Sequence, residues 1–577
     1  MTESSLSDRI RRLVLANALA HGGAARGGPI LARLLATDPE LRSRSSELAP
    51  LVAGRIREVS QLSPEQQATE LANLGGPEPE GPRQGSGSSA ELPELPGAVP
   101  GHVTLRLAPF PSGALHVGNA RMLYLNDAYR RRYDGRLLLV FDDTIGSAEK
   151  RVDPELFEVI LDDLRIAEVP VDAVYYKSDR IPRFYPWARR VIDAGGAYVC
   201  TCPAELLREN RRVGRPCPER EQPPEQTVDG WEGMLGGRYA EGEAVLRLRT
   251  DLADPDPAFR DRVLFRISEL EHPRVGRKYR VWPLLEFSWA VDDLELGISH
   301  VLRGKDLVME DRMEEHLWRL LGLTGPSFLH WGILRVREAK LSKSKSYQEV
   351  RSGAYDGWAD PRTWSIRSLR RRGIRSEALR RFTLSFGMSL ADIEVPAETL
   401  YAENRQLIDG TTPRRAFVPD PVAVEVESYP EDLGTVVLPN HPEREELGKR
   451  EVRAGPIFWL PGVELARHAG EEIRLKDLVN VTLPAAVAPL GGTDPIRARF
   501  TSRENRRLPR IQWVGAEGSV EVDLLEVDGT HRRGRGESAL TEAAPGSPFQ
   551  FERVGFVRLD PEHPPGAGPV RACYGHP

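Results

Sequence analysis

The spacing of apolar residues changes several times along this chain of 577 residues. Residues 1–75 carry leucine, isoleucine and valine three and four positions apart, the spacing typical of amphipathic helices. Residues 76–98 are rich in Gly, Pro, Ser and Glu, a composition that buries too little apolar surface to fold. We therefore predict an N-terminal helical extension joined to the rest by a flexible linker.

Beyond the linker, short β-branched runs alternate with helical patterns, as in a doubly wound parallel sheet. The strand candidates are VTLRL at 103–107, LLLVF at 137–141 and AVYY at 173–176. Loops and short runs such as AVLRLR and RVLFRI interrupt the alternation over 200–283. The prediction is an α/β fold with a Rossmann-type domain in two halves, 99–199 and 284–335, split by an inserted module.

The last two segments differ from each other in pattern. Residues 336–405 include a helical stretch at 361–382 that carries eight arginines, whereas residues 406–577 show short β-rich runs separated by Gly and Pro. Such runs favour antiparallel barrels. Unpaired positive charge favours contact with a polyanion such as RNA, although a solvated helix face is the alternative. The candidate RNA-binding residues are Arg367, Arg370, Arg371, Arg372 and Arg375.

The segment RLAPFPSGALHVGNAR, residues 106–121, is predicted to pass from a strand through a turn into a helix. His116 and Gly118 then fall in the first helical turn, where free N–H groups and the helix dipole favour anions. An ordinary turn with an exposed histidine is the alternative.

A second segment, AKLSKSKS at 339–346, is unusual for its lysines. The chain has 79 basic residues, only nine of them lysine, and Lys340, Lys343 and Lys345 fall within six positions. Lysine is a compact point charge that can follow a phosphate whose charge grows during reaction. A solvated basic loop would explain this segment alone, but together the two segments fit a fixed floor and a mobile flap closing on a triphosphate.

HVGN and KLSKS resemble the paired motifs of class I aminoacyl-tRNA synthetases, and the first segment is most similar to the archaeal-type glutamyl branch. The resemblance continues in four further segments: LVLANALAHGGAA near the N-terminus, FDDTIGSAEKRVDPE from Phe141, HVLRGKDL from His300 and NRQLIDGTTPRRAFVPDP from Asn404. It implies an acceptor-binding role for the insertion at 200–283, a KLSKS loop and stem-contact domain at 336–405, and β-barrel anticodon-binding domains at 406–577.

The resemblance also implies a set of ATP-binding residues. His116 and Lys343 would be catalytic, because they would stabilise charge on the phosphates. The implied ATP-binding residues are Pro109, Ser112, Gly113, His116, Gly118, Asn119, Lys340, Leu341, Ser342, Lys343 and Ser344. Mg²⁺ would accompany ATP, held largely by phosphates and water.

For the amino acid, the resemblance implies Arg106, Ala108, Asp142 and Arg303. Asp142 would meet the α-ammonium group. The glutamyl relatives carry arginine at the position of Arg303 and the glutaminyl relatives a cysteine, so Arg303 indicates glutamate, whose carboxylate a guanidinium binds with two hydrogen bonds. The structural alternative is an ion pair between Arg303 and Asp306.

Three residues depart from the family pattern. Asn119 occupies the fourth position of the HIGH motif but can still donate a hydrogen bond. Ile145 ends the FDDTD pattern and removes a polar contact. Leu285 stands where a tyrosine is common, so we expect specificity to depend more on Arg106 and Arg303.

Cys200, Cys202 and Cys217 resemble a zinc knuckle of the inserted module, but the fourth ligand position falls at Glu219. Buried free thiols are the favoured interpretation, and a zinc site at these three cysteines is the alternative.

Composition limits the remaining choices. The net charge of −6 excludes a general basic field, and four cysteines suit a reducing cytosol rather than a disulfide scaffold. No signal peptide or membrane span is evident. We expect a cytoplasmic monomer that uses ATP, L-glutamate and tRNA(Glu), with charging of tRNA(Gln) left open. The alternatives are a glutamine–tRNA ligase, a catalytically inactive tRNA-binding paralogue, and a tRNA-nucleoside-modifying relative, which typically lacks the C-terminal barrels.

Overall fold

A computed structural model describes residues 3–20, 25, 27, 30, 45–74, 76, 92–144, 152–339, 341, 343–485, 494–563 and 568–577. The chain forms two compact units, Met1–Ser88 and Ser89–Pro577. Within those described ranges, no helix has both the length and the apolar content needed to cross a bilayer.

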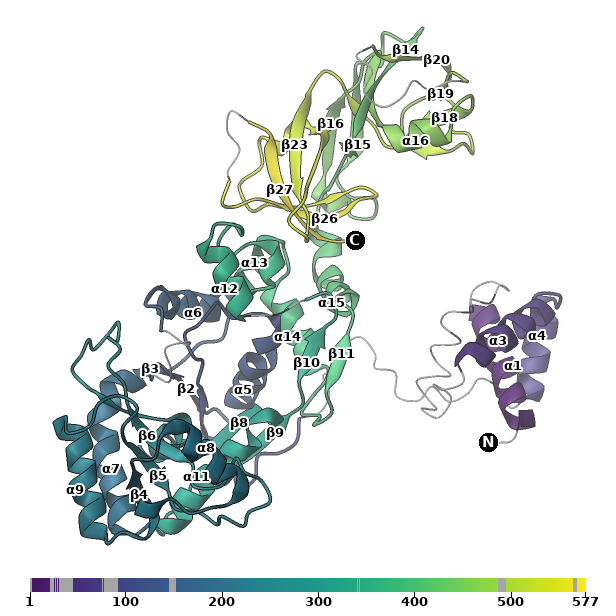
Figure 1. Cartoon of the computed structure of the whole chain (residues 1–577). Coiled ribbons are helices and arrows are strands. Elements are labelled where there is room, and N and C mark those ends of the chain that lie inside the picture. The colour runs from purple at the N-terminus through teal and green to yellow at the C-terminus, as the bar shows by residue number, and fades with distance from the viewer. Residues whose placement is uncertain are drawn as a thin grey trace. The chain divides into compact units, whose positions relative to one another are not determined.

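The first unit is helical, as predicted, and its three described helices appear together in Figure 1. They are α1 (Glu3–Ala20), α3 (Ser45–Val59) and α4 (Pro64–Asn73). Leu13, Val14 and Val52 are among the apolar residues that form its core. Ser63 caps α4 by accepting from the Gln66 N–H, while the Gln66 side chain accepts from the Ser63 N–H, which satisfies two N–H groups at the helix start. Most of the predicted linker lies outside the described residues.

The second unit begins with a parallel sheet. Strands β1, β2 and β3 are parallel neighbours in that order. Strand β8 lies beside β1, because the Ser299 N–H donates to the Thr104 carbonyl at 3.0 Å, and β9 runs parallel to β8. The bounds are β1 (Thr104–Leu107), β2 (Arg136–Phe141), β3 (Ala173–Tyr176), β8 (His300–Gly304) and β9 (Ser327–Trp331), with α5 (Ala120–Arg132) and α6 (Glu155–Ile166) as crossovers. The predicted doubly wound fold is confirmed.

A four-stranded antiparallel sheet lies between β3 and β8 in the sequence, where the insertion is expected. Its core is aromatic: Phe265, Trp282 and Phe287 are almost completely buried. The segment LEFSWAVDD, which directly follows the insertion, lies in helix α10. The bounds are α7 (Ile181–Asp193), β4 (Ala197–Cys200), α8 (Ala204–Val213), α9 (Pro224–Gly236), β5 (Val245–Leu248), β6 (Val263–Ile267), β7 (Val281–Pro283), α10 (Leu285–Glu295) and α11 (Val308–Leu320).

A mostly helical region follows and is joined to the HVGN turn by backbone hydrogen bonds. The Val117 N–H donates to the Trp364 carbonyl at 3.0 Å, and the Ile366 N–H donates to the Leu115 carbonyl at 2.8 Å. The bounds are β10 (Leu334–Val336), α12 (Lys343–Arg351), α13 (Ile366–Arg371), α14 (Ser376–Leu384), β11 (Ile393–Val395) and α15 (Glu398–Ile408).

The C-terminal part contains two seven-stranded sheets, one nested inside the other in the sequence (Figure 1). The outer sheet has the order β12-β25-β26-β27-β23-β24-β13, and the inner one β21-β18-β19-β20-β14-β17-β22. In each sheet the two terminal strands are consecutive in the chain, so each sheet curls round into a barrel.

The outer barrel is built from β12 (Arg414–Arg415), β13 (Phe417–Pro419), β23 (Ser519–Leu525), β24 (His531–Glu537), β25 (Pro548–Phe551), β26 (Gly555–Leu559) and β27 (Val570–His576). The inner barrel is built from β14 (Pro421–Glu427), β17 (Ile457–Pro461), β18 (Glu472–Leu475), β19 (Asn480–Thr482), β20 (Ile496–Ser502), β21 (Arg510–Ile511) and β22 (Val514–Gly515). Strands β15 (Thr435–Pro439) and β16 (Lys449–Arg453) pair as a separate hairpin.

The barrels differ from the prediction in two respects. Four strand pairs are parallel, β12–β25, β14–β20, β18–β21 and β23–β27, and of these only β12–β25 joins strands on either side of the inner barrel. The run FWLPGVEL is half strand and half helix, since α16 (Gly462–Arg467) begins directly after β17.

Candidate active site

The loop after β1 and the end of β2 lie together at the carboxyl edge of the parallel sheet. The Asp142 N–H donates to the Pro109 carbonyl at 3.1 Å, and the Ser112 N–H to the Phe110 carbonyl at 2.9 Å, which tightens the turn. Parallel α/β sheets bind ligands at this edge. The turn implied to bind ATP and the aspartate implied to bind the amino acid therefore share one edge of the sheet.

The HVGN turn is a short 3₁₀ helix that leads into α5. His116 is its N-cap: Nδ1 accepts from the Gly118 N–H at 3.1 Å, and the Asn119 side-chain oxygen accepts from the His116 N–H at 3.1 Å. Since Nδ1 accepts, the imidazole proton is on Nε2, the nitrogen that can then donate to a phosphate. The Gly118 N–H was expected to be free for an anion, but in this structure it is bound to His116.

The HVGN turn and the KLSKS segment meet at Gly118 and Leu341. A Cβ added at Gly118 would lie 3.0 Å from Leu341 Cδ1 and 2.9 Å from His116 Cε1, so only glycine allows this approach. His116, Leu341 and Ser365 line one closed space of about 10 Å³. Lys340 and Ser342 lie outside the described residues, as do the side chains of Lys343 and Ser344, whose backbone begins α12.

A cavity of about 320 Å³ adjoins the HVGN turn. Its wall includes five residues implied by the sequence to bind ATP or the amino acid, Arg106, Ala108, Gly118, Asn119 and Arg303. These residues come from β1, the HVGN turn and β8, so segments nearly 200 positions apart in the chain face one space. Trp289 of α10 lies in the same wall.

The two arginines that line the cavity are ion-paired with acidic side chains of the protein. Arg106 makes a bidentate ion pair with Asp293, its Nη2 donating to Oδ2 at 2.8 Å. Arg303 donates from Nε to Asp311 at 2.7 Å and from Nη2 to Glu314 at 2.8 Å. The alternative pair of Arg303 with Asp306 is therefore wrong. Arg303 Nη1 is buried and has no hydrogen-bond partner among the described residues.

Glu314 on α11 is a functional candidate that the sequence did not reveal. It is completely buried, and burial raises its pKa to about 8, against the opposing charge of Arg303. A carboxyl group that is largely neutral at pH 7 leaves part of the positive charge of Arg303 available to a ligand. The sequence EDRMEEH offers four acids in this helix, and nothing in their spacing marks this one.

Asp142 lies at the end of β2 and has a cation beside it. Its Oδ1 is 3.4 Å from Lys177 Nζ and accepts from the Thr144 hydroxyl at 3.3 Å. Lys177 itself is completely buried and donates to the Ser288 hydroxyl at 2.7 Å. The carboxylate implied to meet an α-ammonium group thus already faces an ammonium group of the protein.

Three of the five arginines implied to bind RNA are bonded within the protein. Arg367 donates to Asp163 at 2.9 Å, and Arg371 to both oxygens of Asp560 at 2.9 and 2.6 Å. Arg372 is buried and donates to the Tyr401 hydroxyl and to the Gly575 carbonyl. Their guanidinium groups hold α13 against its neighbours, including the outer barrel.

The other two, Arg370 and Arg375, are exposed and line a groove of about 660 Å³ together with Arg165 and Arg558. Among the described residues, neither Arg370 nor Arg375 has an ion-pair partner. Arg558 donates to the Arg370 and Gly546 carbonyls, so it too carries charge without an acid beside it. Four arginines and two acids, Glu168 and Glu377, line this groove, so it keeps an excess of positive charge and is a candidate surface for RNA.

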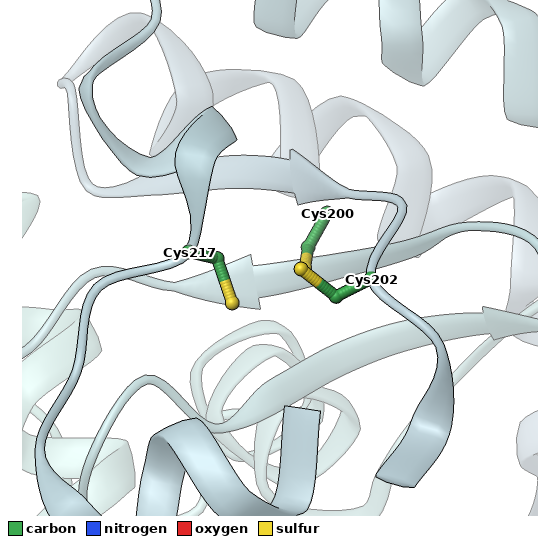
Figure 2. A group of neighbouring side chains, drawn as sticks. All are labelled: Cys200, Cys202 and Cys217. Carbon is green, nitrogen blue, oxygen red and sulfur yellow. The ribbon is translucent and has the colours of Figure 1, made fainter. Parts of the chain in front are cut away.

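The three cysteines of the insertion form a cluster, with Cys217 facing Cys200 and Cys202 from a neighbouring segment (Figure 2). Their sulfur atoms lie within 4.8 Å of one another. The buried Arg247 donates to Cys217 Sγ at 2.9 Å. Burial raises the pKa of Cys217, but hydrogen bonding from Asn210 and the charge of Arg247 outweigh it and leave the pKa lowered.

This cluster does not fit a structural zinc ion. Three thiols could supply three of the four ligands of a tetrahedral zinc ion. However, the Arg247 guanidinium group already donates to Cys217, so zinc would be a second cation beside this sulfur. The expected fourth ligand, Glu219, is 3.9 Å from Cys202 Sγ and is hydrogen-bonded to Thr201 instead. The arrangement favours free thiols stabilised by a guanidinium group.

Comparison with known proteins gives matches along almost the whole chain. The family model described as "tRNA synthetases class I (E and Q), catalytic domain" matches residues 102–409. Two models described as the anti-codon binding domain of the same family match residues 412–492 and 510–560.

Individual relatives are similar over their full length. A glutamate–tRNA ligase of Methanopyrus kandleri is 40% identical over 590 residues, covering 100% of both chains. The corresponding enzyme of Pyrococcus abyssi is 39% identical, covering 95% of this chain and 96% of its own. Among solved structures, the glutamate–tRNA synthetase of Elizabethkingia anophelis aligns with a TM-score of 0.38 at 18% identity, covering 53% of this chain and 70% of that one.

Proposed function

Because the chain belongs to the class I tRNA synthetases for glutamate and glutamine, we propose that it is a glutamate–tRNA ligase that charges tRNA(Glu). The observation that carries this assignment is the single cavity that holds Arg106, Arg303 and the HVGN turn. It offers guanidinium groups for a dicarboxylic acid directly beside a turn suited to phosphate.

The reaction has two steps. A carboxylate oxygen of glutamate attacks the α-phosphorus of ATP, and pyrophosphate leaves. A ribose hydroxyl at the 3′ end of the tRNA then attacks the acyl carbon, and AMP leaves. Both steps depend on positioning and on stabilising developing charge rather than on a protein nucleophile.

His116 and Lys343 are the residues proposed to stabilise that charge. His116 carries its proton on Nε2, and Gly118 lets the nucleotide approach the backbone. The space between His116 and Leu341 holds about one water, so ATP binding requires Leu341 to move off Gly118. Lys343 begins helix α12, which directly follows this segment. When the segment closes again over bound ATP, it would bring the Lys343 side chain to the phosphates. Mg²⁺ would enter the site together with ATP.

Arg303 is the residue proposed to select glutamate. Its Nη1 is buried and without a partner among the described residues, so a substrate carboxylate would satisfy it. The amide of glutamine would leave a buried positive charge without an anion. Arg370 and Arg375, in the groove with Arg558, are the proposed contacts to the tRNA backbone.

One aminoacylation assay tests the assignment, with glutamate or glutamine and with tRNA(Glu) or tRNA(Gln). We expect glutamate to be charged onto tRNA(Glu), and the tRNA(Gln) arm decides whether both tRNAs are used. Preferential use of glutamine would identify a glutamine–tRNA ligase, and no charging at all an inactive tRNA-binding paralogue.

A lysine pair tests the flap. We expect Lys343→Ala to lower the rate of charging by ~10²–10³ while tRNA affinity stays unchanged. Lys345→Ala, two positions along the same helix, is the matched control and should leave charging near the wild-type rate. Equal losses in both variants would show that the flap needs only general positive charge.

A further inference from the structure

Lys177 is a buried cation that the proposed reaction does not yet use. The chain has nine lysines, and among those whose side chains the structure describes only Lys177 is buried, with none of its surface exposed. Taking an ammonium group out of water is costly unless anions and hydrogen-bond acceptors surround it. The surroundings of Lys177 therefore indicate what it is for.

Four groups face its ammonium nitrogen. The Ser288 hydroxyl lies at 2.7 Å and Asp142 Oδ1 at 3.4 Å, while the ring of Trp289 lies with its centroid at 5.1 Å. Asp292 of α10 is a further buried carboxyl group close enough to interact with Lys177, but it is engaged by Arg180 at 2.6 Å. Lys177 thus has two buried carboxyl groups near it: Asp142, at 3.4 Å, and Asp292, whose Oδ1 accepts from Arg180 and whose Oδ2 has no hydrogen-bond partner among the described residues.

Trp289 connects this lysine to the cavity. The same indole ring has Arg106 Cζ at 4.8 Å and Arg303 Cζ at 5.0 Å from its centroid. Trp289, Arg106 and Arg303 all line the 320 Å³ cavity. Three cations therefore surround one aromatic ring, and each has its own acid: Arg106 has Asp293, Arg303 has Asp311 and Glu314, and Lys177 has Asp142.

We propose that Lys177 is a specificity-determining residue of the amino-acid site, where its ammonium group holds Asp142 and reduces the dependence of binding on the ammonium group of the ligand. This inference rests on the proposed function. Asp142 is not part of the cavity wall, but Trp289 joins its partner Lys177 to that wall, and an amino acid whose ammonium group reaches Asp142 must share the carboxylate with a cation of the protein. A dicarboxylate that lacks the ammonium group meets no such competition.

The proposal makes the two kinds of ligand respond in opposite directions to loss of Lys177. Without it, Asp142 has an uncompensated charge that attracts the ammonium group of L-glutamate and repels a dicarboxylate. At a separation of about 4 Å and partial burial, one charge changes binding by roughly tenfold or more. A purely structural lysine would instead weaken both ligands together.

The experiment is isothermal titration of the full chain with L-glutamate and with glutarate, which is glutamate without its ammonium group. For the wild-type protein we expect the Kd of glutarate to be within about tenfold of that of L-glutamate. A larger preference for L-glutamate contradicts the proposal, and this arm needs no variant to fold.

Lys177→Gln supplies the second arm, since its amide can keep the hydrogen bond to Ser288. We expect the Kd of L-glutamate to fall and that of glutarate to rise, each by roughly tenfold. Lys177→Arg, which keeps the charge, should restore the wild-type ratio. Lys278→Gln is the matched control, because Lys278 also lies over an aromatic ring, Tyr279, but is exposed and has no ion-pair partner among the described residues.

Parallel weakening of both ligands in Lys177→Gln, or no change in their ratio, would overturn the proposal. Failure of the proposed function is distinguishable from these results: wild-type protein that binds and charges no glutamate contradicts the ligase assignment itself, whereas normal glutamate charging with an unchanged ratio contradicts only the role of Lys177.

Discussion

Arginines are dense both in the cavity beside the HVGN turn and in helices α13 and α14, but they are used differently in the two regions. In the cavity wall, Arg106 and Arg303 are ion-paired with acids of the protein, and Arg303 keeps one buried nitrogen without a partner among the described residues. In α13, Arg371 and Arg372 have their donors bonded to Asp560 and to carbonyl groups near the C-terminus. The first arrangement prepares a guanidinium for a ligand, and the second joins two parts of the fold.

The difference shows that the density of arginine in a sequence does not by itself locate a binding surface. The deciding quantity is the number of N–H donors, out of the five of each guanidinium group, that are not hydrogen-bonded within the protein. By this criterion the proposed RNA contact is limited to Arg370 and Arg375 of the five predicted arginines, with Arg558 in addition.

The largest expected effect is on the cavity. Arg303→Gln should lower kcat/KM for glutamate by ~10³–10⁴, because the site loses its carboxylate-binding donors and leaves buried acids without a counter-charge. Aminoacylation at varied glutamate concentration measures this. The control is Arg312→Gln. Arg312 is a partly exposed arginine of α11, and its replacement should leave activity near normal. Normal glutamate kinetics in Arg303→Gln would contradict the assignment of Arg303 as a ligand-binding arginine.

Arg371→Ala tests the structural arginines. Removing it leaves the buried Asp560 without its arginine counter-charge, which typically costs about 3–5 kcal/mol in the free energy of unfolding. The exposed neighbour Arg370→Ala should change it by less than about 0.5 kcal/mol. Urea denaturation of both variants measures the contrast, and equal stabilities would contradict it.

Arg370→Ala and Arg375→Ala should act on RNA binding instead. Each is expected to weaken tRNA affinity a few-fold and to reduce the slope of log K against log salt by about 1, since one phosphate contact is lost. Filter binding at several salt concentrations measures this. Arg319→Ala, an exposed arginine of α11 outside the groove, should leave both quantities unchanged.

The smallest expected effect is on the pH dependence of stability and concerns Glu314, the buried acid that pairs with Arg303. Burial raises the folded-state pKa of Glu314 to about 8, above its ordinary value, so between roughly pH 5 and pH 8 the folded protein holds a proton that the unfolded chain has lost. Its contribution to stability is therefore present at low pH and is lost as the pH rises through this window. Glu314→Gln should flatten this part of the stability profile, as thermal denaturation across pH would show. An unchanged profile would place the titration elsewhere.

The sequence predicted the strands of the parallel sheet well, because the apolar runs of β1 and β2 are buried on both faces. VTLRL, LLLVF and AVYY match β1, β2 and β3 to within one residue. The meeting of HVGN with KLSKS was predicted as well, and Leu341 lies against Gly118 as that prediction requires. The roles of the individual site residues stay predictions.

The acids that position the arginines could not be predicted. Asp293 is 187 positions from Arg106, and no local pattern distinguishes it from its neighbour Asp292, which pairs with Arg180. Lys177 was likewise overlooked, because a single lysine after a strand is usually exposed. Such pairings are fixed by tertiary packing, where burial makes the choice of partner costly to change.

The nesting of the two barrels has a consequence for the order in which the protein folds. Strands β12 and β13 pair with β25 and β24, whose residues follow the entire inner barrel. During synthesis the inner barrel can complete its pairing first, while the opening strands of the outer barrel wait for partners more than 110 residues away. Closure of the outer barrel, and with it the bond between Arg371 and Asp560, is thus a late event on the ribosome.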